Sequence, residues 1–310
     1  SWNVNGIRAV ERKGLLSVLS GADIACVQET KAAPPDLRPD TAFLPARSHA
    51  SAWAFARRKG YSGVATYWQR GGRWAARGGR AGLGGAEGEG EGEGEEEDVG
   101  EEEGRAVVTD HGAFVLFNLY FPNPAQGRRL PYKLRFWQAV IQAVQRERAA
   151  GREVVLVGDL NAARTPLDTH SPEAAAFHPP ELALFDALLA GPSPIMVDAF
   201  RALHPEERQY SWWDPKTGAR ERDEGWRIDY VLVSAGLMPR VTACEYLTST
   251  LGSDHCPVRL QLADPLPCPD RTFTPELNEV IVDKAIRWSD RGVVGVDLGG
   301  PRPHPGRYDY

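Results

Sequence analysis

The feature that most constrains the fold is a series of short apolar runs, each ending in polar or charged residues. The clearest runs lie at 22–29, 112–122, 152–161 and 223–234. Runs of this length, rich in valine, leucine and aromatic residues, predict buried β-strands. A chain that consists mainly of such strands must bury them in sheets that pack against other layers.

Helical periodicity is rarer than strand patterning in this chain. The clearest case is the segment 132–151, whose apolar face comprises Leu134, Trp137, Val140, Ile141 and Val144. The segment ends at Gly151, a residue typical of helix ends. Many strands with few intervening helices predict an α/β fold in which sheet packs on sheet and helices lie outside.

A low-complexity segment rich in glycine and glutamate interrupts the strand pattern at 71–104. It carries a net charge of −8, compared with −6 for the whole chain, so the remainder carries about +2. A segment of this composition buries too little apolar area to offset the conformational entropy lost on ordering, which predicts a disordered insertion. Because it lies between strand-like runs at 62–68 and 105–110, we expect an enlarged hairpin loop within one domain.

Two interpretations of this acidic insertion stay open. The simpler one is a solvated loop without function, and the other is an autoinhibitory or nucleic-acid-repelling role. The near-neutral remainder of the chain is compatible with a local basic face. We expect one domain over 1–265 that contains the insertion, followed by a partly disordered C-terminal extension over 266–310.

Composition argues against a membrane-spanning protein and against a protein held together by disulfides or a zinc site. No run of 18 apolar residues occurs, so a membrane span is not expected. The four cysteines, Cys26, Cys244, Cys256 and Cys268, form no C-x-x-C pair, which predicts reduced thiols in an intracellular protein. The sequence starts at Ser1 without an initiator methionine, so we expect the first strand to lack its opening residues.

Polar residues collect where the predicted strands end. Five such ends carry Asn3 with Asn5, Glu29, Asp159 with Asn161, Asp229, and Asp254 with His255. A lone carboxylate there is usually a turn former, but five ends at one sheet edge would form a polar pocket. Four carboxylates cannot all stay ionised together without a cation or an imidazolium. Oxygen ligands with one histidine favour Mg²⁺, with Mn²⁺ as the alternative, over Zn²⁺.

The chemistry of these groups suits attack by water on phosphorus. Asp159 and Asn161 lie two residues apart in "GDLN", so at strand spacing they share a face. Asp229 is the partner expected to fix the tautomer of His255 and keep it protonated. The chain has no G-x-S-x-G and no P-loop. Ordinary turn chemistry and a satisfied structural histidine are the structural alternatives.

Eight motifs then occur in a familiar order: "SWNVNGIR", "CVQETK", "GYSGVA", "YFPN", "GDLN", "YSWW", "GWRIDY" and "GSDHCPV". In this order the chain resembles the exonuclease III family of apurinic/apyrimidinic (AP) endonucleases, within the endonuclease/exonuclease/phosphatase superfamily. The subtype resembles AP endonuclease 2 of eukaryotes, with bacterial features. The resemblance implies a catalytic domain with a four-layered α/β sandwich, in which two mainly antiparallel sheets are flanked by helices.

The resemblance also implies roles for the matching residues. Metal ligation would involve Glu29, Asp254, Asn3 and Asn5, although Asn5 stands where family members often have aspartate. Asp159 would activate the attacking water with help from Asn161. The pair of His255 and Asp229 would stabilise the charge of the scissile phosphate, which Tyr120 and Asn123 would also bind.

Specificity and partners follow from the same resemblance. Trp212, Trp226 and Ile228 match the positions that wall a pocket for a flipped abasic sugar. Contacts with the DNA backbone would come from Arg8, Lys31, Arg128, Arg129, Lys133, Arg164, Lys216 and Arg220. The expected partner is double-stranded DNA with abasic sites or blocked 3′ ends. We expect a monomer in the nucleus, without membrane contact, and leave sliding-clamp or repair-protein partners open.

The implied activity is Mg²⁺-dependent hydrolysis 5′ to an abasic site during base excision repair, with 3′–5′ exonuclease or 3′-phosphodiesterase activity. Two alternatives stay open. One is another phosphodiesterase of the superfamily that acts on RNA, retroelement targets or phosphoinositides. The other is a catalytically weakened protein that binds DNA damage.

Overall fold

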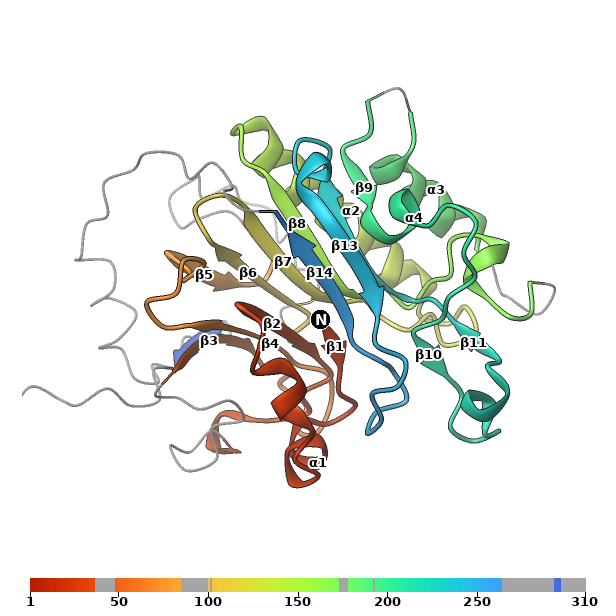
Figure 1. Ribbon diagram of the computed structural model, residues 1–310, viewed down its shortest axis with the longest axis horizontal. Coiled ribbons are helices and arrows are strands. Elements are labelled where there is room, and N and C mark those ends of the chain that lie inside the picture. Colours follow the sequence, from red (N-terminus) through yellow and green to blue (C-terminus); the bar gives the residue numbers. More distant parts are fainter. Residues whose placement is uncertain are drawn as a thin grey trace, which may run out of the picture.

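Two β-sheets packed face to face form the centre of the molecule (Figure 1). The computed structural model describes residues 1–36, 48–84, 100, 102–172, 178–191, 193–263 and 293–296. Within these residues the first sheet has five strands, in the spatial order β1 (Trp2–Asn3), β2 (Ile24–Gln28), β4 (Val64–Gln69), β3 (His49–Ala54) and β15 (Val293–Val296). Only its β1–β2 pair is parallel.

The second sheet has six strands in the described part of the chain. Their order is β5 (Gly78–Ala81), β6 (Ala106–Asp110), β7 (Val115–Tyr120), β8 (Val154–Asp159), β12 (Asp229–Ser234) and β9 (Met196–Asp198). The β7–β8 pair is parallel and the others are antiparallel. The parallel pair is joined by a helix, as a parallel connection requires.

Two ribbons complete the strands. They are β10 (Trp212–Trp213) with β11 (Gly225–Trp226), and β13 (Val241–Tyr246) with β14 (Val258–Leu262). The second ribbon adjoins the first sheet, because Ser1 and Val258 exchange backbone hydrogen bonds of 2.8 Å. The ribbon brings the segment before β14 to the same edge as β1.

Helices lie outside the two sheets (Figure 1). The α-helices are α1 (Ile7–Arg12), α2 (Leu130–Ala149), α3 (Pro179–Leu189) and α4 (Ala199–Leu203), and the 3₁₀ turns are η1 (Leu15–Leu19), η2 (Pro34–Asp36), η4 (Pro166–Asp168), η5 (Ala219–Arg222) and η6 (Met238–Arg240). The α2 and α3 helices pack on the outer face of the second sheet. The α1 helix packs on the first sheet.

Strand alternation explains the layers. On β8, Val154 and Leu156 belong to the core under α2 and α3, whereas Val155 and Val157 belong to the core that faces Cys26 of the first sheet. Successive side chains of a strand point to opposite faces, so a strand buried on both faces is apolar throughout. The predicted α/β sandwich of two sheets with flanking helices is confirmed.

The prediction of a disordered insertion over 71–104 is wrong at both ends, because residues 100 and 102–104 are described as well and Glu103 bonds Arg105 and Arg129. Residues 71–84 are described, and Gly78–Ala81 form β5, which pairs with β6. Three contacts hold this segment in place. Its backbone pairs with β6, Leu83 is buried, and Arg80 forms an ion pair of 3.2 Å with Glu147. Residues 85–99 and 101 lie outside the described part.

The predicted hairpin between the runs at 62–68 and 105–110 is also wrong. The two runs form β4 and β6, which belong to different sheets. Both sides of β4 are already taken by β2 and β3, so the chain crosses to the second sheet and forms a β5–β6 hairpin there. Of the predicted extension over 266–310, only Val293–Val296 are described, where they pair with β3.

Candidate active site

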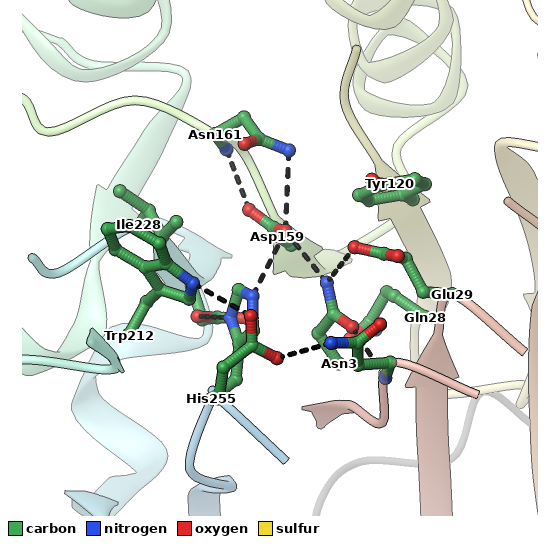
Figure 2. Close-up of polar contacts among 12 residues, drawn as sticks. Asn3, Gln28, Glu29, Tyr120, Asp159, Asn161, Trp212, Ile228 and His255 are labelled. Atoms are coloured by element: carbon green, nitrogen blue, oxygen red, sulfur yellow. Dashed lines mark hydrogen bonds and ion pairs between the residues drawn. The ribbon is translucent and has the colours of Figure 1, made fainter. Parts of the chain in front are cut away.

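The predicted polar strand ends meet at one edge of the two sheets (Figure 2). The end of β8 lies beside the start of β12, where Asp159 and Asp229 are register partners. Asn3 ends β1, and its Nδ2 donates to Glu29 Oε1 at 3.0 Å and to Asp159 Oδ2 at 2.9 Å. One buried amide therefore joins carboxylates from both sheets.

A tight turn brings Asn161 back onto Asp159. The spacing predicted that Asp159 and Asn161 share one face of a strand. Instead, the strand ends at Asp159, and Asn161 lies in a turn with a φ of 51°, which brings its side chain back to Asp159. Asn161 N donates to Asp159 Oδ1 at 2.8 Å, and its side-chain Nδ2 donates to Asp159 Oδ2 at 3.3 Å. The glycine of "GDLN" is needed because a Cβ on Gly158 would lie 1.9 Å from the carbonyl oxygen of Leu119.

His255 and Asp229 form the predicted pair, with 2.7 Å between Nδ1 and Oδ2. Burial lowers the pKa of His255, but Asp229, Asp159 and Asp254 outweigh it and raise the pKa to about 10. The ring is therefore an imidazolium at neutral pH, with its Nδ1–H donated to Asp229. Its Nε2 faces Asp159 Oδ2 at 3.8 Å.

The ionised form of Asp159 is disfavoured in this cluster. Burial raises its pKa to about 7, and the charges of Asp229 and Glu29 add to this effect while His255 opposes it. Strongly shifted groups in a cleft are typical of functional sites. A carboxylate with a pKa near 7 is suited to accept a proton at neutral pH.

Glu29 lies where a cation is already accommodated. Lys31 Nζ is 3.0 Å from Glu29 Oε2 and also contacts Asn5 Oδ1. Burial raises the pKa of Glu29, but the bonds from Asn3 and Lys31 bring it below its usual value. Among the described residues, ligand atoms of Glu29, Asp159 and His255 lie within 4.8 Å of one another. Because the imidazolium is not a ligand, the carboxylates are the groups that fit a hard divalent ion.

Backbone strain coincides with these residues. Four non-glycine residues of the site have a positive φ, namely Asn5, Glu29, Lys31 and Asn161. Such conformations persist only where the surroundings enforce them, and they cluster at functional sites. The "GYSG" motif supplies part of this support, since Thr30 N and Lys31 N donate to the carbonyl oxygens of Gly63 and Ser62.

Asp254 lies to one side of this group. Its Oδ1 accepts from Asn5 Nδ2 at 2.9 Å, and its Oδ2 accepts from Trp212 Nε1 at 3.0 Å. Burial raises the pKa of Asp254, but His255 and these hydrogen bonds lower it overall. Of the four predicted metal residues, Glu29 thus lies in the acidic centre, whereas Asp254 and Asn5 border it and Asn3 orients carboxylates through its nitrogen.

A cavity of about 430 Å³ opens over this centre. Its lining residues are Glu29, Tyr120, Asn123, Pro124, Asp159, Asn161, Ala162, Ala163, His178, Glu181, Leu182, Trp212, Trp226, Ile228, Asp254 and His255. The structure therefore brings all three predicted pocket residues, Trp212, Trp226 and Ile228, to the same cavity. Tyr120 lies on the opposite side, above Glu29 (Figure 2).

Asn123 reaches the site through Asn161. It is exposed, and its Nδ2 donates to Asn161 Oδ1 at 3.1 Å. Sequence reasoning missed Lys133 as a site residue and proposed it for the DNA backbone. Lys133 is fully buried, donates to the carbonyl oxygen of Asn161 at 2.7 Å and pairs with Glu181 at 2.5 Å. Its position three and four residues before Phe136 and Trp137, on the face of the helix that is buried, was the available signal.

Other predicted DNA-backbone residues are also used internally. Arg220 donates to the carbonyl oxygens of Thr248, Thr250 and Ser253, and it lies over the ring of Trp213 at 4.6 Å. Arg164 pairs with Asp186 at 2.8 Å. These side chains support the loops around the cavity, so their basic character is not evidence for DNA contact.

Arg227 belongs to a second buried cluster beside the cavity. Its Nε and Nη2 donate to Asp168 and Asp198 at 2.7 and 2.8 Å. Arg201 also bonds Asp168 at 2.8 Å, and the Arg227 guanidinium lies 4.4 Å from the ring of Tyr230. We call these four charged residues the Arg227 cluster. It holds the strand segment that presents Trp226 and Ile228 to the cavity.

Comparison with known proteins identifies the family. The model of the Endonuclease/Exonuclease/phosphatase family matches residues 1–255. The chain therefore belongs to this family, and the resemblance predicted from the eight motifs is confirmed. Enzymes of this family are hydrolases, which agrees with a site in which carboxylates lie beside an imidazolium.

The most informative relatives are nucleases. An exodeoxyribonuclease of Bacillus subtilis is 35% identical over 272 residues, which cover 84% of this chain and 97% of the relative. DNA repair nuclease APEX1 of Danio rerio is 35% identical over 273 residues, covering 85% and 81%. The chain is thus equally similar to a bacterial and to a vertebrate nuclease.

A solved structure supports the same assignment. The catalytic domain of Xenopus laevis APE2 superposes with a TM-score of 0.73 at 31% identity, covering 89% of this chain and 97% of that one. In the described part of this chain, no helix is long and apolar enough to cross a membrane.

Proposed function

We propose that this chain is a DNA repair nuclease that hydrolyses the phosphodiester 5′ to an abasic site, with Mg²⁺ as cofactor. Its expected side activities are 3′–5′ exonuclease and 3′-phosphodiesterase. The observation that carries the proposal is the cavity that joins the Asp159–Asn161 turn and the His255–Asp229 pair to an aromatic and apolar wall. The names of the relatives support DNA as the substrate.

The roles of the site residues follow from their contacts. Asp159 accepts the proton of an attacking water, and Asn161 fixes its carboxylate by two hydrogen bonds. His255, held by Asp229, directs a positive Nε2–H toward the phosphate. Tyr120 donates to the same phosphate, because burial raises its pKa well above the usual value and keeps the phenol neutral.

A divalent ion would be held by Glu29, with Asp254 and the Asn3 and Asn5 amides around it. When bound, it neutralises charge on the phosphate and the leaving 3′-oxygen. The place taken by the Lys31 ammonium between Glu29 and Asn5 supports this assignment. Glu29 and Asn5, which contact this ammonium, are two of the four residues that the motifs predicted for metal ligation.

The wall of the cavity supports the choice of an abasic sugar. Ile228 is buried, and Trp212 and Trp226 are half-buried, so the three offer apolar surface without base-pairing groups. A sugar that carries no base fits such a pocket after it is flipped out of the duplex. We expect the chain to act as a monomer on double-stranded DNA in the nucleus.

A nicking assay tests the proposal. A duplex with a central tetrahydrofuran abasic analogue is incubated with the wild type in Mg²⁺, in Mn²⁺ and in EDTA. Glu245→Gln is the matched control, because this carboxylate on the β13–β14 ribbon pairs with Arg259 and does not line the cavity. We expect metal-dependent nicking by both proteins. Binding without any nick would support the damage-binding alternative and would overturn the proposed activity.

A further inference from the structure

One buried arginine holds Tyr120 from two directions. Arg105 Nη1 donates to the carbonyl oxygen of Tyr120 at 3.0 Å, and its guanidinium carbon lies 4.7 Å from the centre of the Tyr120 ring. The backbone N–H of Tyr120 donates in turn to the carbonyl oxygen of Arg105 at 2.9 Å. Both the main chain and the ring of Tyr120 are thus fixed by the same residue.

Arg105 is 1% exposed, so its charge requires nearby partners. Its Nε donates to Glu103 Oε2 at 2.6 Å, and its Nη2 donates to the Tyr61 hydroxyl at 2.9 Å. Burial lowers the pKa of Arg105, but Glu103 and the neighbouring tyrosines raise it overall, so the guanidinium stays charged. Arg105 is therefore a satisfied but fully enclosed cation directly behind Tyr120.

Glu103 connects this arginine to the acidic insertion. It is one of the last residues of the predicted segment 71–104, and Arg129 at the start of α2 also bonds both of its oxygens, at 2.7 and 2.9 Å. The following Gly104 packs so closely that a Cβ there would lie 2.4 Å from the backbone of Phe55. The end of the insertion is thus docked against the protein by specific contacts.

We propose that Arg105 is a positioning residue for Tyr120, and that Glu103 anchors Arg105, so that the docked end of the acidic insertion forms part of the support of the active site. The proposal rests on the proposed function, in which Tyr120 contacts the scissile phosphate. A guanidinium can bond a carbonyl and stack on a ring at once because it is planar with several fixed donors. A lysine in its place keeps the charge but loses one of the two contacts.

A double-mutant cycle tests the proposal in the full-length chain on the abasic duplex. Arg105→Met is measured alone and with Tyr120→Phe, which removes only the hydroxyl. We expect Arg105→Met to lower kcat by about 10-fold with KM changed less than about twofold, and to lower it less than about twofold when the hydroxyl is absent. Equal losses in both backgrounds would mean a purely structural role and would overturn the proposal.

Milder variants cover the case in which Arg105→Met does not fold. Glu103→Gln removes the anchor charge at a half-buried position, and Glu102→Gln is its control because that exposed carboxylate pairs with Arg57 on the surface. We expect Glu103→Gln to lower kcat by about threefold, Arg105→Lys to restore part of the activity of Arg105→Met, and Glu102→Gln to have no effect. Equal kcat values for Glu103→Gln and Glu102→Gln would refute the role of the insertion.

A readout without catalysis separates this proposal from the proposed function. In protein labelled with 3-fluorotyrosine, the resonance of Tyr120 is the one missing in Tyr120→Phe. We expect it to be shifted and broadened by Arg105→Met and unaffected by Glu102→Gln. An unchanged resonance in Arg105→Met would refute the positioning role, whereas absence of nicking by the wild type would refute only the proposed function.

Discussion

Two of the buried charge clusters in the described part of the chain differ in how they balance charge. The Arg227 cluster sets two arginines against Asp168 and Asp198. The active-site cluster sets four carboxylates, Glu29, Asp159, Asp229 and Asp254, against the Lys31 ammonium and the His255 imidazolium. When all four carboxylates are ionised, the excess of two negative charges equals the charge of one divalent cation.

The pKa values show the consequence of this difference. In the Arg227 cluster, burial raises the pKa of Asp168, but Arg227 outweighs burial and lowers it. In the active-site cluster, burial and neighbouring carboxylates raise the pKa of Asp159 to about 7. Loss of one partner from the balanced cluster leaves a buried charge uncompensated, whereas the crowded cluster is already electrostatically unfavourable, which is typical of a functional site.

The largest expected effect is on activity and belongs to the active-site cluster. Asp159→Asn should lower kcat by about 10³-fold, which equals about 4 kcal/mol of transition-state stabilisation. The variant should unfold at the same urea concentration as the wild type or a higher one, because a carboxylate with a raised pKa is destabilising when ionised. Single-turnover nicking and urea unfolding at pH 7.5 check both parts. A large loss of stability in Asp159→Asn would contradict the view that the active-site cluster is electrostatically unfavourable in the folded protein.

The next effect is on stability and belongs to the Arg227 cluster. Arg227→Met removes the guanidinium that pairs with buried Asp198 and leaves Arg201 to pair with Asp168, so we expect a loss of about 3 kcal/mol or more in the free energy of unfolding. Urea unfolding followed by fluorescence measures it. Arg222→Met is the matched control, because Arg222 pairs with Glu224 on the surface and should change stability little. An equal change in the free energy of unfolding in the two variants would show that the buried cluster contributes no more to stability than a surface ion pair.

The same cluster predicts a pH dependence of defined sign. Because the pKa of Asp168 is lowered in the folded protein, its stabilisation is present above its unfolded pKa, near 3.9. The stabilisation is lost as the pH falls through the folded value. The stability difference between wild type and Asp168→Asn should therefore be constant near pH 7 and shrink below about pH 4. A difference that grows on acidification would contradict the assignment.

A smaller effect should come from metal binding without DNA. At a Mg²⁺ concentration 100 times its Kd, binding to the folded state alone stabilises it by about 2.7 kcal/mol. Glu29→Gln should abolish this increase in the melting temperature, whereas Glu245→Gln should retain it. Retention of the full Mg²⁺ effect in Glu29→Gln would place the cation elsewhere.

The smallest effect concerns the pocket wall that the Arg227 cluster supports. Trp226→Ala should raise KM for the abasic duplex by about 10-fold, or about 1.4 kcal/mol, because it removes apolar surface around the sugar. Steady-state nicking measures KM. Comparison with an undamaged duplex tests selectivity, and an unchanged preference for the abasic strand would remove Trp226 from the pocket.

The sequence was sufficient to predict the family and the meeting of the strand ends. The order of the motifs carried this information. As it implied, His255 contacts Asp229, and Trp212 lies beside Trp226. The partners of Arg227 could not be predicted, because Asp168 and Asp198 lie 59 and 29 residues away in the sequence and no local pattern links them. Contacts of this kind are fixed by tertiary packing.

The wrong predictions have a similar cause. The glycine-rich β5 has no apolar alternation, and only its pairing with β6 makes it a strand. Lys133 was predicted to contact the DNA backbone, yet it is buried, where Glu181 and the Asn161 carbonyl satisfy it. In both cases the stabilising partner comes from a distant segment.

The most direct test of the account is the chemistry of the cut itself. A 5′-labelled strand with an internal abasic site is incubated with the wild type in Mg²⁺, and a DNA polymerase is then offered the product. Hydrolysis 5′ to the lesion predicts a product that ends in a 3′-hydroxyl, is extended by the polymerase, disappears in EDTA and is reduced about 10³-fold by Asp159→Asn. A product with a blocked 3′ end that forms equally in EDTA would contradict the account.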